Sequence, residues 1–208
     1  MSITGYQEGE VLTEGTRRNL KCIAVSGNPL PSLEWFAGGI KLDSAKVDKG
    51  EADSYVSSEI LVTVDRADNA KKYECKGKNE ANPDAPVTRS LRMSVEFPPR
   101  VLNITVSPPK PVEGESAVLT CVTDTSNPGV SIRWRHNGDI LEATDSKSKP
   151  GPHGGLVTTN VLQIDVTTEH VGAEFTCEAS HDNFTTTIRN TTVLTIKCKL
   201  FSFTFHII

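Results

Sequence analysis

A chain of 208 residues is long for one small β-domain and suits two domains of about 100 residues each. Its 37% hydrophobic and 23% charged residues are typical of a soluble globular chain and exclude the composition of a disordered one. The net charge is −4, and no block of Lys and Arg is dense enough to neutralise a run of phosphates, so nucleic acid is not an expected partner.

The first half of the chain alternates turn signals with residues spaced for β-strands. The Glu14-Gly15 turn leads into a strand that carries Cys22, and Trp35 follows 13 residues after this cysteine. Residues two apart face the same side of a strand, so we expect Leu33 and Trp35 to point inward and Glu34 to face solvent. Further inward residues of this half are Leu20, Ile60, Val62, Val64 and Cys75.

The second half of the chain repeats the first. Cys121 and Trp134 each stand 99 residues after their counterparts, Cys22 and Trp35, which indicates one domain fold present twice. In both halves a second cysteine follows the tryptophan, after 40 residues in the first and 43 in the second. The inward strand residues of the second half are Leu119, Ile132, Leu162, Ile164, Val166 and Cys177.

The order Cys, Trp, Cys in each half resembles the signature of immunoglobulin-type β-sandwiches. Two cysteines on opposite sheets meet only across a core about 10 Å thick, with the tryptophan packed against the bridge. We therefore predict an all-β chain of two tandem immunoglobulin-like β-sandwiches with Trp35 and Trp134 in their cores. The predicted disulfides join Cys22 to Cys75 and Cys121 to Cys177.

The residue two positions before each second cysteine differs between the halves. Tyr73 is placed for a tyrosine corner, in which the hydroxyl bonds the backbone a few residues upstream. Phe175 has no hydroxyl, so we expect packing to fix the same corner of the second domain, helped by Gly172 at a positive φ. Both aromatic side chains are predicted core residues.

The subtype and the domain boundary follow from spacing and from prolines. The cysteine separations of 53 and 56 residues leave little room for the extra strands of a variable-type domain, which favours the intermediate or constant-like set. Pro98-Pro99 ends one apolar pattern and Val101 starts the next, so we predict domains at 1–97 and 98–197 with a semi-rigid joint. The tail at 198–208 fits no domain start.

Particular turns carry a closer resemblance. The Gly5-Tyr6 opening and the Asn-Pro turns at Asn28 and Asn127 are more specific than the cysteines and tryptophans that all immunoglobulin domains share. They make about residues 3–197 similar to two consecutive interior domains of the nephrin family, including its sticks-and-stones type. The segments that carry the resemblance are 5–10, 27–31, 68–70, 73–75, 97–99, 126–128 and 154–159.

The resemblance implies a segment of an extracellular cell-cell adhesion receptor that acts as a rigid spacer or protein-binding module. In this family a type I membrane receptor binds an immunoglobulin partner of the kirrel type, mainly through its amino-terminal domain. Homophilic contacts stay open, and no partner-binding residue is carried over to an interior pair. We find neither a signal peptide nor the ~20 apolar residues that span a bilayer, so we expect a fragment of a single-pass cell-surface protein.

Three sequons in the second half are predicted glycosylation sites. Asn183 falls in the expected last hairpin turn, and Asn190 lies on the strand that follows, where its side chain is expected to face outward. Asn103 lies on the first strand of its domain. It can carry a glycan only if Val101, Asn103 and Thr105 form the outward set of that strand.

No residue pattern points to catalysis, a metal or another cofactor. The five histidines show no metal-ligand spacing, and His153 belongs to a glycine-rich stretch, 149–155, read as a flexible connection between the Trp134 and Leu162 strands. A nucleophile elbow, a phosphate loop and a paired His-Glu motif are all missing, so we expect no enzyme. Cys198 is left over, and we expect no role for it, with an interchain bond or a reactive thiol as alternatives.

The expected outer strand faces are charged. Arg133 and Arg135 are interpreted as solvated residues, with interface anchors as the alternative, and Phe36 is the nearest candidate for an apolar hot spot. Two other functions stay open: a ligand-binding segment of a signalling receptor such as a receptor kinase, and an elastic spacer of an intracellular muscle protein. The complete cysteine pairs argue against the second, because cytosolic disulfides rarely persist.

Overall fold

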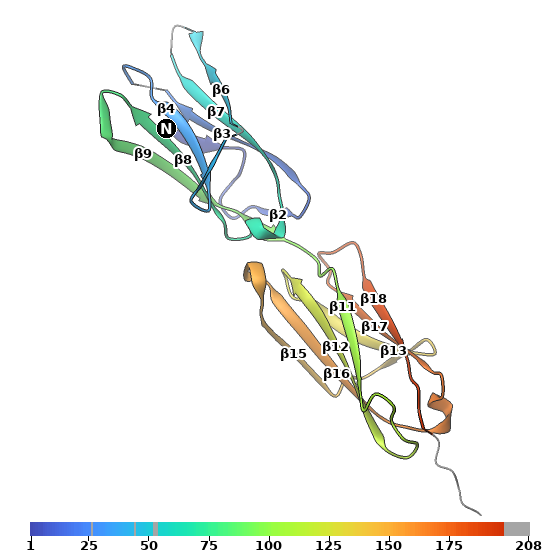
Figure 1. Ribbon diagram of the computed structural model, residues 1–208. Helices are drawn as coiled ribbons and strands as arrows, with labels where there is room; N and C mark the ends of the chain where they lie inside the picture. The colour runs from blue at the N-terminus through green and yellow to red at the C-terminus, as the bar shows by residue number, and fades with distance from the viewer. Residues whose placement is uncertain (26, 44, 52–53, 198–208) are drawn as a thin grey trace, which may run out of the picture. The chain divides into compact units, whose positions relative to one another are not determined.

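The computed structural model describes residues 1–25, 27–43, 45–51 and 54–197, and strands dominate them. Cys198 and the predicted tail lie outside the described residues. The chain divides into two compact units, Met1–Phe97 and a second that begins at Pro98. Each unit contains two four-stranded β-sheets (Figure 1), which confirms the predicted all-β fold of two tandem immunoglobulin-like sandwiches. No helix in the described ranges is long and apolar enough to cross a membrane.

The first unit has one sheet in the order β1-β3-β7-β6 and another in the order β5-β4-β8-β9. A short parallel pair joins β2 to β10, while β1 pairs with β3, so the opening segment contacts both sides of the sandwich. The strands are β1 Ser2–Thr4, β2 Val11–Thr13, β3 Arg17–Ala24, β4 Ser32–Ala37, β5 Ile40–Leu42, β6 Lys46–Lys49, β7 Val56–Thr63, β8 Lys72–Asn79, β9 Asn82–Arg92 and β10 Ser94–Glu96.

Gly5 and Tyr6 shape the crossing between β1 and β2. Gly5 has φ +95°, and a Cβ atom there would lie 2.0 Å from the carbonyl oxygen of Asn19, so only glycine fits. The Tyr6 hydroxyl donates to the Glu10 carbonyl at 2.6 Å and accepts the Ser94 backbone N–H at 3.0 Å. The Gly-Tyr opening is therefore a requirement of the fold.

The second unit repeats this arrangement, with sheets β11-β12-β16-β15 and β14-β13-β17-β18. An isolated parallel bridge between Val112 and Lys197 takes the place of the β2–β10 pair. The strands are β11 Leu102–Ser107, β12 Ser116–Ser126, β13 Ser131–His136, β14 Asp139–Leu141, β15 Asp145–Pro150, β16 Leu156–Asp165, β17 Glu174–Ser180 and β18 Ile188–Val193. Short 3-10 turns lie at Arg66–Asp68, Pro152–Gly154 and Thr168–His170.

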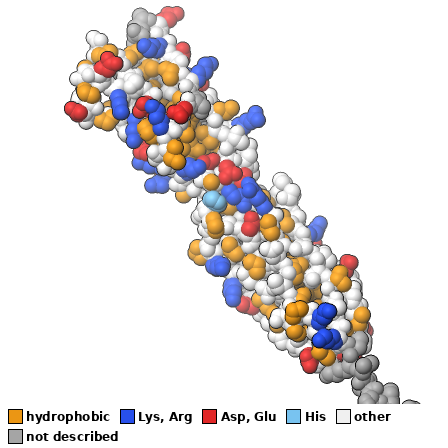
Figure 2. Space-filling view, in the orientation of Figure 1, with side chains coloured by type: hydrophobic (Ala, Val, Ile, Leu, Met, Phe, Trp, Pro, Cys, Tyr) orange, Lys and Arg blue, Asp and Glu red, His pale blue; other side chains and the backbone are white. Residues whose placement is uncertain are grey.

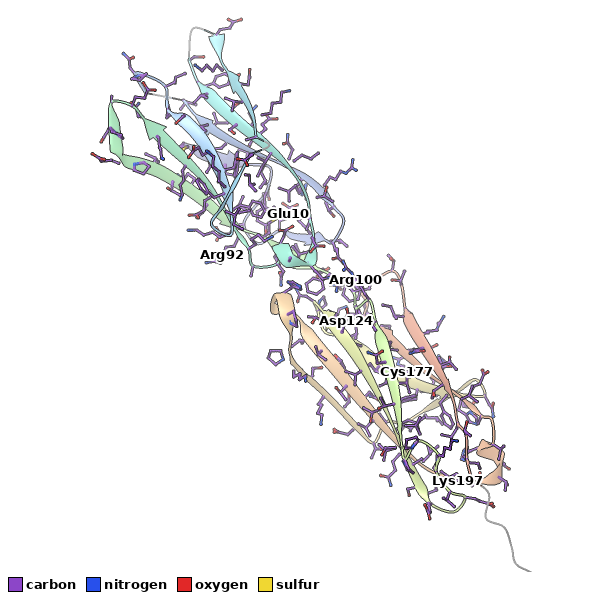
Figure 3. The ribbon with its side chains drawn as sticks, in the orientation of Figure 1. Glu10, Arg92, Arg100, Asp124, Cys177 and Lys197 are labelled. Atoms are coloured by element: carbon purple, nitrogen blue, oxygen red, sulfur yellow. A yellow bond between two sulfur atoms is a disulfide. The ribbon has the colours of Figure 1, made fainter. Side chains whose placement is uncertain are left out.

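Aspartate anchors the start of the second unit. The Asp124 carboxylate, near the end of β12, accepts the backbone N–H groups of Arg100 at 2.7 Å and Val101 at 3.0 Å. Figure 3 labels Arg100 and Asp124 close together at the start of this unit. The backbone N–H groups at the start of the second sandwich are therefore hydrogen-bonded before its first strand begins.

The expected intermediate or constant-like set holds, although one short extra strand fits in each domain. β5 and β14 add a three-residue strand to the edge of β4 and of β13. Gly38, Gly39 and Gly138, all at positive φ, make the tight turns that let so short a strand fold back. Each domain thus gains a short fourth strand on one sheet.

The reading of 149–155 as a flexible connection was wrong. β15 occupies Asp145–Pro150 and pairs with β16 over its whole length, so the segment is the end of a hairpin. The Gly151 N–H donates to the Gly155 carbonyl at 2.9 Å and closes its turn. The exposed His153 sits in that turn at φ 58°.

Candidate functional site

The disulfides and tryptophans form the two cores. Cys22 is bonded to Cys75 and Cys121 to Cys177, with Cα–Cα distances of 6.4 and 6.5 Å. Trp35 and Trp134 are fully buried within the same clusters as these bridges. The Trp35 indole N–H donates to the buried carbonyl of Ser58 at 3.2 Å. These residues hold the opposed sheets together in the core, so any binding site has to be sought on the outer faces of the sheets.

The corner at Tyr73 differs from the expected one. Its hydroxyl donates to a side chain, the Asp68 carboxylate, at 3.0 Å, where a backbone acceptor was expected. Burial and the neighbouring Asp68 carboxylate raise the pKa of Tyr73 above its ordinary value. The phenol therefore stays protonated and acts as a structural donor.

The second domain fixes its corner with rings, as expected from the missing hydroxyl. Phe175 is buried, and the His136 ring stacks on it with centroids 4.6 Å apart. His170 approaches the same ring at 5.9 Å. Gly172 has φ +70°, as predicted, and its N–H donates to the Leu194 carbonyl at 3.0 Å.

The outer face of β4 and β8 is charged and internally paired. Lys41 Nζ donates to Glu34 Oε1 at 2.7 Å, and this hydrogen bond holds the pKa of Glu34 below its usual value. Phe36 is only partly exposed, and Lys76 Nζ lies 4.2 Å from its ring centroid in a cation–π contact. Phe36 is thus covered by a cation and does not form an apolar anchor.

The equivalent face of the second domain is organised by Glu178. Arg135 Nε donates to Glu178 Oε2 at 2.8 Å, and Arg189 Nε donates to Oε1 at 2.6 Å. The Arg135 and Arg189 hydrogen bonds lower the pKa of Glu178. Arg133 stands directly opposite Glu178 in the β13–β17 register and is exposed, with no ion pair to any described residue.

The three sequon asparagines have different surroundings. Asn103 is exposed on β11, with Val101 and Thr105 also exposed on its side. Asn183 is exposed in the connection between β17 and β18. Asn190 lies on β18, and its Nδ2 donates to the Leu102 carbonyl of β11 at 2.6 Å. Asn190 therefore joins two strands that no β-ladder connects.

Sequence reasoning missed a buried ion pair and two edge arginines. Arg66 Nε and Nη2 donate to the two carboxylate oxygens of Glu14 at 3.0 and 2.9 Å, with Phe97 under the guanidinium. The edge arginines are Arg89 and Arg92 of β9. The sequence carries a signal for Arg89, because Val87 and Leu91, two residues before and after it, are apolar and lie on the same side of the strand. Within the described ranges, no group of three His, Cys, Asp or Glu side chains is placed to hold a metal.

Figure 2 shows how side chains are distributed on one face of the molecule. Orange hydrophobic groups are scattered among blue and red charged ones on each unit, and no single apolar area dominates the view. This agrees with the ion pairs that cover the outer strand faces.

Family models of immunoglobulin domains match both units. One described as an immunoglobulin domain matches residues 2–79, and one described as a CD80-like C2-set immunoglobulin domain matches residues 102–188. Among solved structures, Rst D1-D2 has a TM-score of 0.61 at 19% identity, covering 93% of this chain and 97% of that one. The full ectodomain of mouse nectin-like molecule 4 has a TM-score of 0.59 at 16% identity, covering 90% of this chain and 66% of that one.

Curated relatives extend the match along the chain. Mouse nephrin is 32% identical over 194 residues, which cover 93% of this chain and 15% of the mouse protein. Human nephrin is 29% identical over 187 residues, covering 85% of this chain and 14% of its own length. Human Kin of IRRE-like protein 1 is 30% identical over 138 residues, covering 64% of this chain and 18% of its own. Two sandwiches, two immunoglobulin family models and a match to nephrins over most of the sequence make this chain a nephrin-family member of the immunoglobulin superfamily.

Proposed function

We propose that the chain is part of the extracellular region of a nephrin-like cell-cell adhesion receptor, where its two domains act as a rigid spacer. The continuous match to nephrins over 85% and 93% of the chain supports this most directly. The parent would be a single-pass membrane protein that engages an immunoglobulin-superfamily partner of the kirrel type through other domains. The second domain would carry glycans.

The outer strand faces favour a spacer over a main recognition site. A protein interface of standard size needs about 800 Å² per partner around an apolar or aromatic centre. On β4 and β8, Phe36 lies under the ammonium of Lys76. On β13 and β17, Glu178 is already bonded by Arg135 and Arg189. Because these charges are already paired within the domain, a partner that displaced the existing pairs would gain little binding free energy.

The same contacts support a role without catalysis. A shallow cleft on the second domain is lined by Arg135, Glu174, Glu178 and Arg189, among others. Its central carboxylate, Glu178, has a lowered pKa because two guanidinium groups bond it, so it is a poor proton acceptor at neutral pH. The hydroxyl in this lining, that of Thr176, is hydrogen-bonded to the Thr191 hydroxyl at 2.8 Å.

Rigidity at the joint is proposed from sequence. Pro98-Pro99 restricts the backbone between the domains and leaves few free residues. Solution scattering of the wild-type chain and of a Pro98→Gly, Pro99→Gly variant tests the joint. We expect the variant to sample a broader distribution of dimensions, and equal distributions would contradict a joint stiffened by the prolines.

A domain exchange tests the spacer function. Residues 1–197 would replace the matching pair of domains in a nephrin ectodomain displayed on cells, and mixing with kirrel-displaying cells would be scored. We expect mixing to be retained, while residues 1–197 alone should show no saturable binding to the kirrel ectodomain at micromolar concentration. A matched exchange with Cys22→Ser and Cys75→Ser should lose mixing. Tight binding by the isolated pair would overturn the spacer proposal and place recognition on this segment.

A further inference from the structure

One sheet edge of the first domain is open. β9 ends the order β5-β4-β8-β9, and β8 is its only partner among the described strands. In Figure 1, β9 is the outermost green strand of this domain. The parallel partner β2 covers β10 and stops short of β9. All of β9 except the half-buried Leu91 is exposed, and no described strand forms a ladder with its outward edge.

Two clefts follow this edge, and Met1 lines both. The first has a volume of about 540 Å³ and includes Arg89, Leu91 and Arg92 of β9 in its lining. The second has a volume of about 370 Å³ and includes Val87 together with the exposed Val25. At one end of the edge, the cations Lys72, Arg89 and Arg92 outnumber the one carboxylate of the cleft lining, Glu8, and at the other end the cleft lining has no charged side chain.

The second domain bridges the corresponding edge with a side-chain hydrogen bond. Its first strand, β11, has six residues and pairs with β12 along its whole length, whereas β1 has three. The Asn190 side chain then bonds the Leu102 carbonyl and joins β18 to β11. In the described residues of the first domain, no backbone hydrogen bond joins β9 to β1. The described residues of the first domain thus lack the side-chain bond that bridges this edge in the second.

The arginines at this edge lack acidic partners. Arg89 Nη1 donates to the Thr88 carbonyl and Arg92 Nη1 to the Ala70 carbonyl, both at 3.1 Å. Neither guanidinium pairs with a carboxylate of the described residues, whereas Lys72 in the same cleft bonds Glu74. Arg92 is labelled at the end of β9 in Figure 3. Guanidiniums without a carboxylate partner, at a strand edge without a ladder partner, favour an acidic, extended ligand.

We propose that the β9 edge binds an extended acidic segment of a partner protein, which adds as a strand beside Val87–Arg92. Pro83 and Pro86 have no N–H to donate, so strand addition is restricted to the part of β9 that follows them. In this part Val87, Arg89 and Leu91 share one face, since they lie opposite Gly77, Cys75 and Tyr73 of β8. A matching ligand presents an apolar, an acidic and an apolar residue at alternate positions.

The probe that tests this is a capped synthetic peptide about six residues long, the length of an average strand. It carries valine, glutamate and valine at alternate positions with threonines between them, and a control peptide has lysine for glutamate. Binding is measured by fluorescence anisotropy, and protection by hydrogen exchange of the backbone amides of 87–92. We expect sub-millimolar binding of the acidic peptide only, with slowed exchange confined to this segment.

Variants separate this site from general charge attraction. Arg89→Glu should weaken peptide binding about tenfold, since it turns the attraction to the glutamate into a repulsion, and Arg92→Glu, on the opposite face of β9, should weaken it less. The matched control is Arg133→Glu on the second domain, an exposed arginine without an ion pair among the described residues, which should change nothing. Unchanged unfolding midpoints verify that the variants fold. Equal binding of the lysine peptide, equal weakening by the control, absent protection at 87–92, or self-association of the chain through this edge would each overturn the proposal.

Discussion

His170 of the second domain holds the place that Asp68 holds in the first. Each is the last residue of a 3-10 turn, and each side chain accepts the backbone N–H that precedes its turn. The Asp65 N–H donates to Asp68 Oδ2 at 2.9 Å, and the Thr167 N–H donates to His170 Nδ1 at 3.0 Å. A carboxylate and an imidazole therefore serve as the same cap.

The cap residue also sets the aromatic partner of each corner. Asp68 accepts the Tyr73 hydroxyl, while His170 lies against the Phe175 ring, five residues on in both domains. A carboxylate is matched by a phenol and an imidazole by a phenyl ring. The pairs are compatible within each domain, and mixing them would leave a hydroxyl or a carboxylate without its partner.

Tyr73→Phe is expected to destabilise the first domain by about 1 kcal/mol, because the buried hydroxyl–carboxylate hydrogen bond is lost. Hydrogen exchange of the core amides, measured domain by domain, reports the change without assuming that both domains unfold together. The matched change in the other domain is Phe175→Tyr, which adds a hydroxyl beside His170 and no carboxylate, and should give no gain in stability. Equal protection of the first domain before and after Tyr73→Phe would show that the bond contributes nothing.

Acidification is expected to weaken the second domain partly through Glu178. The pKa of Glu178 is lowered in the folded state, chiefly by the Arg135 hydrogen bond. Its contribution is therefore complete above the ordinary value of 4.5 and is lost as the pH falls through the lower folded value. The Glu178 side chain is only 13% exposed, but its partners Arg135 and Arg189 are 37% and 62% exposed, so solvent screening should keep the effect below about 1 kcal/mol.

The measurement for Glu178 is unfolding stability between neutral pH and pH ~3. Glu178→Gln should flatten part of the acid dependence, whereas Glu142→Gln, at an exposed carboxylate without an ion pair among the described residues, should leave the profile unchanged. Identical acid profiles for the wild type and Glu178→Gln would contradict the assigned role.

The residue patterns that predicted the fold depend on long spacings and on period. The Cys-Trp-Cys order occurs twice, at an offset of 99 residues, which indicates two copies of one domain. Within each copy, the two cysteines can bond only across a sandwich core, whose thickness varies little, so the two domains could be predicted. β5 and β14 were not, because three residues are too few for a strand period to show. The tandem immunoglobulin domains could be predicted from the sequence, whereas their short edge strands are evident only in the structure.

Side-chain partners were less predictable than strands. The acceptor of Tyr73 is a side chain five residues away, and no spacing rule separates it from a backbone carbonyl. Arg89 falls on an inward phase of β9, and only the open edge explains how an arginine is tolerated there. The bond from Asn190 to Leu102 links positions 88 residues apart in sequence. Such contacts depend on which strand edges lie side by side in the fold. The alternation of inward and outward residues along one strand does not contain that information.

Reduction of the disulfides is expected to destabilise both domains. Each bridge closes a loop of more than 50 residues, with cysteine separations of 53 and 56, and the chain-entropy relation gives about 4 kcal/mol for such a loop. Thermal unfolding with and without reductant measures the loss, and peptide mapping of the non-reduced protein tests the pairing. A bond between Cys22 and Cys121 or Cys177 would contradict two separate sandwiches, and so would melting unaffected by reduction.

The last prediction concerns Asn190, where a sequon and a strand contact coincide. Its amide bonds the Leu102 carbonyl across an edge that no ladder closes, so Asn190→Gln should cost the second domain about 1 kcal/mol by misplacing that donor. Thr192→Val removes the same sequon while keeping the amide and a β-branched strand residue, so it should leave the stability of protein made without glycosylation almost unchanged.

Protein secreted from glycosylating cells completes this comparison. Mass spectrometry should find glycans at the exposed Asn103 and Asn183, and Asn103→Gln should remove one of them without loss of stability. If Asn190 carries a glycan, both Asn190→Gln and Thr192→Val will remove it, yet only the first should speed hydrogen exchange in β11 and β18. Equal exchange in the two variants would mean that the Asn190 amide does not hold this edge and that residue 190 matters only as a sequon.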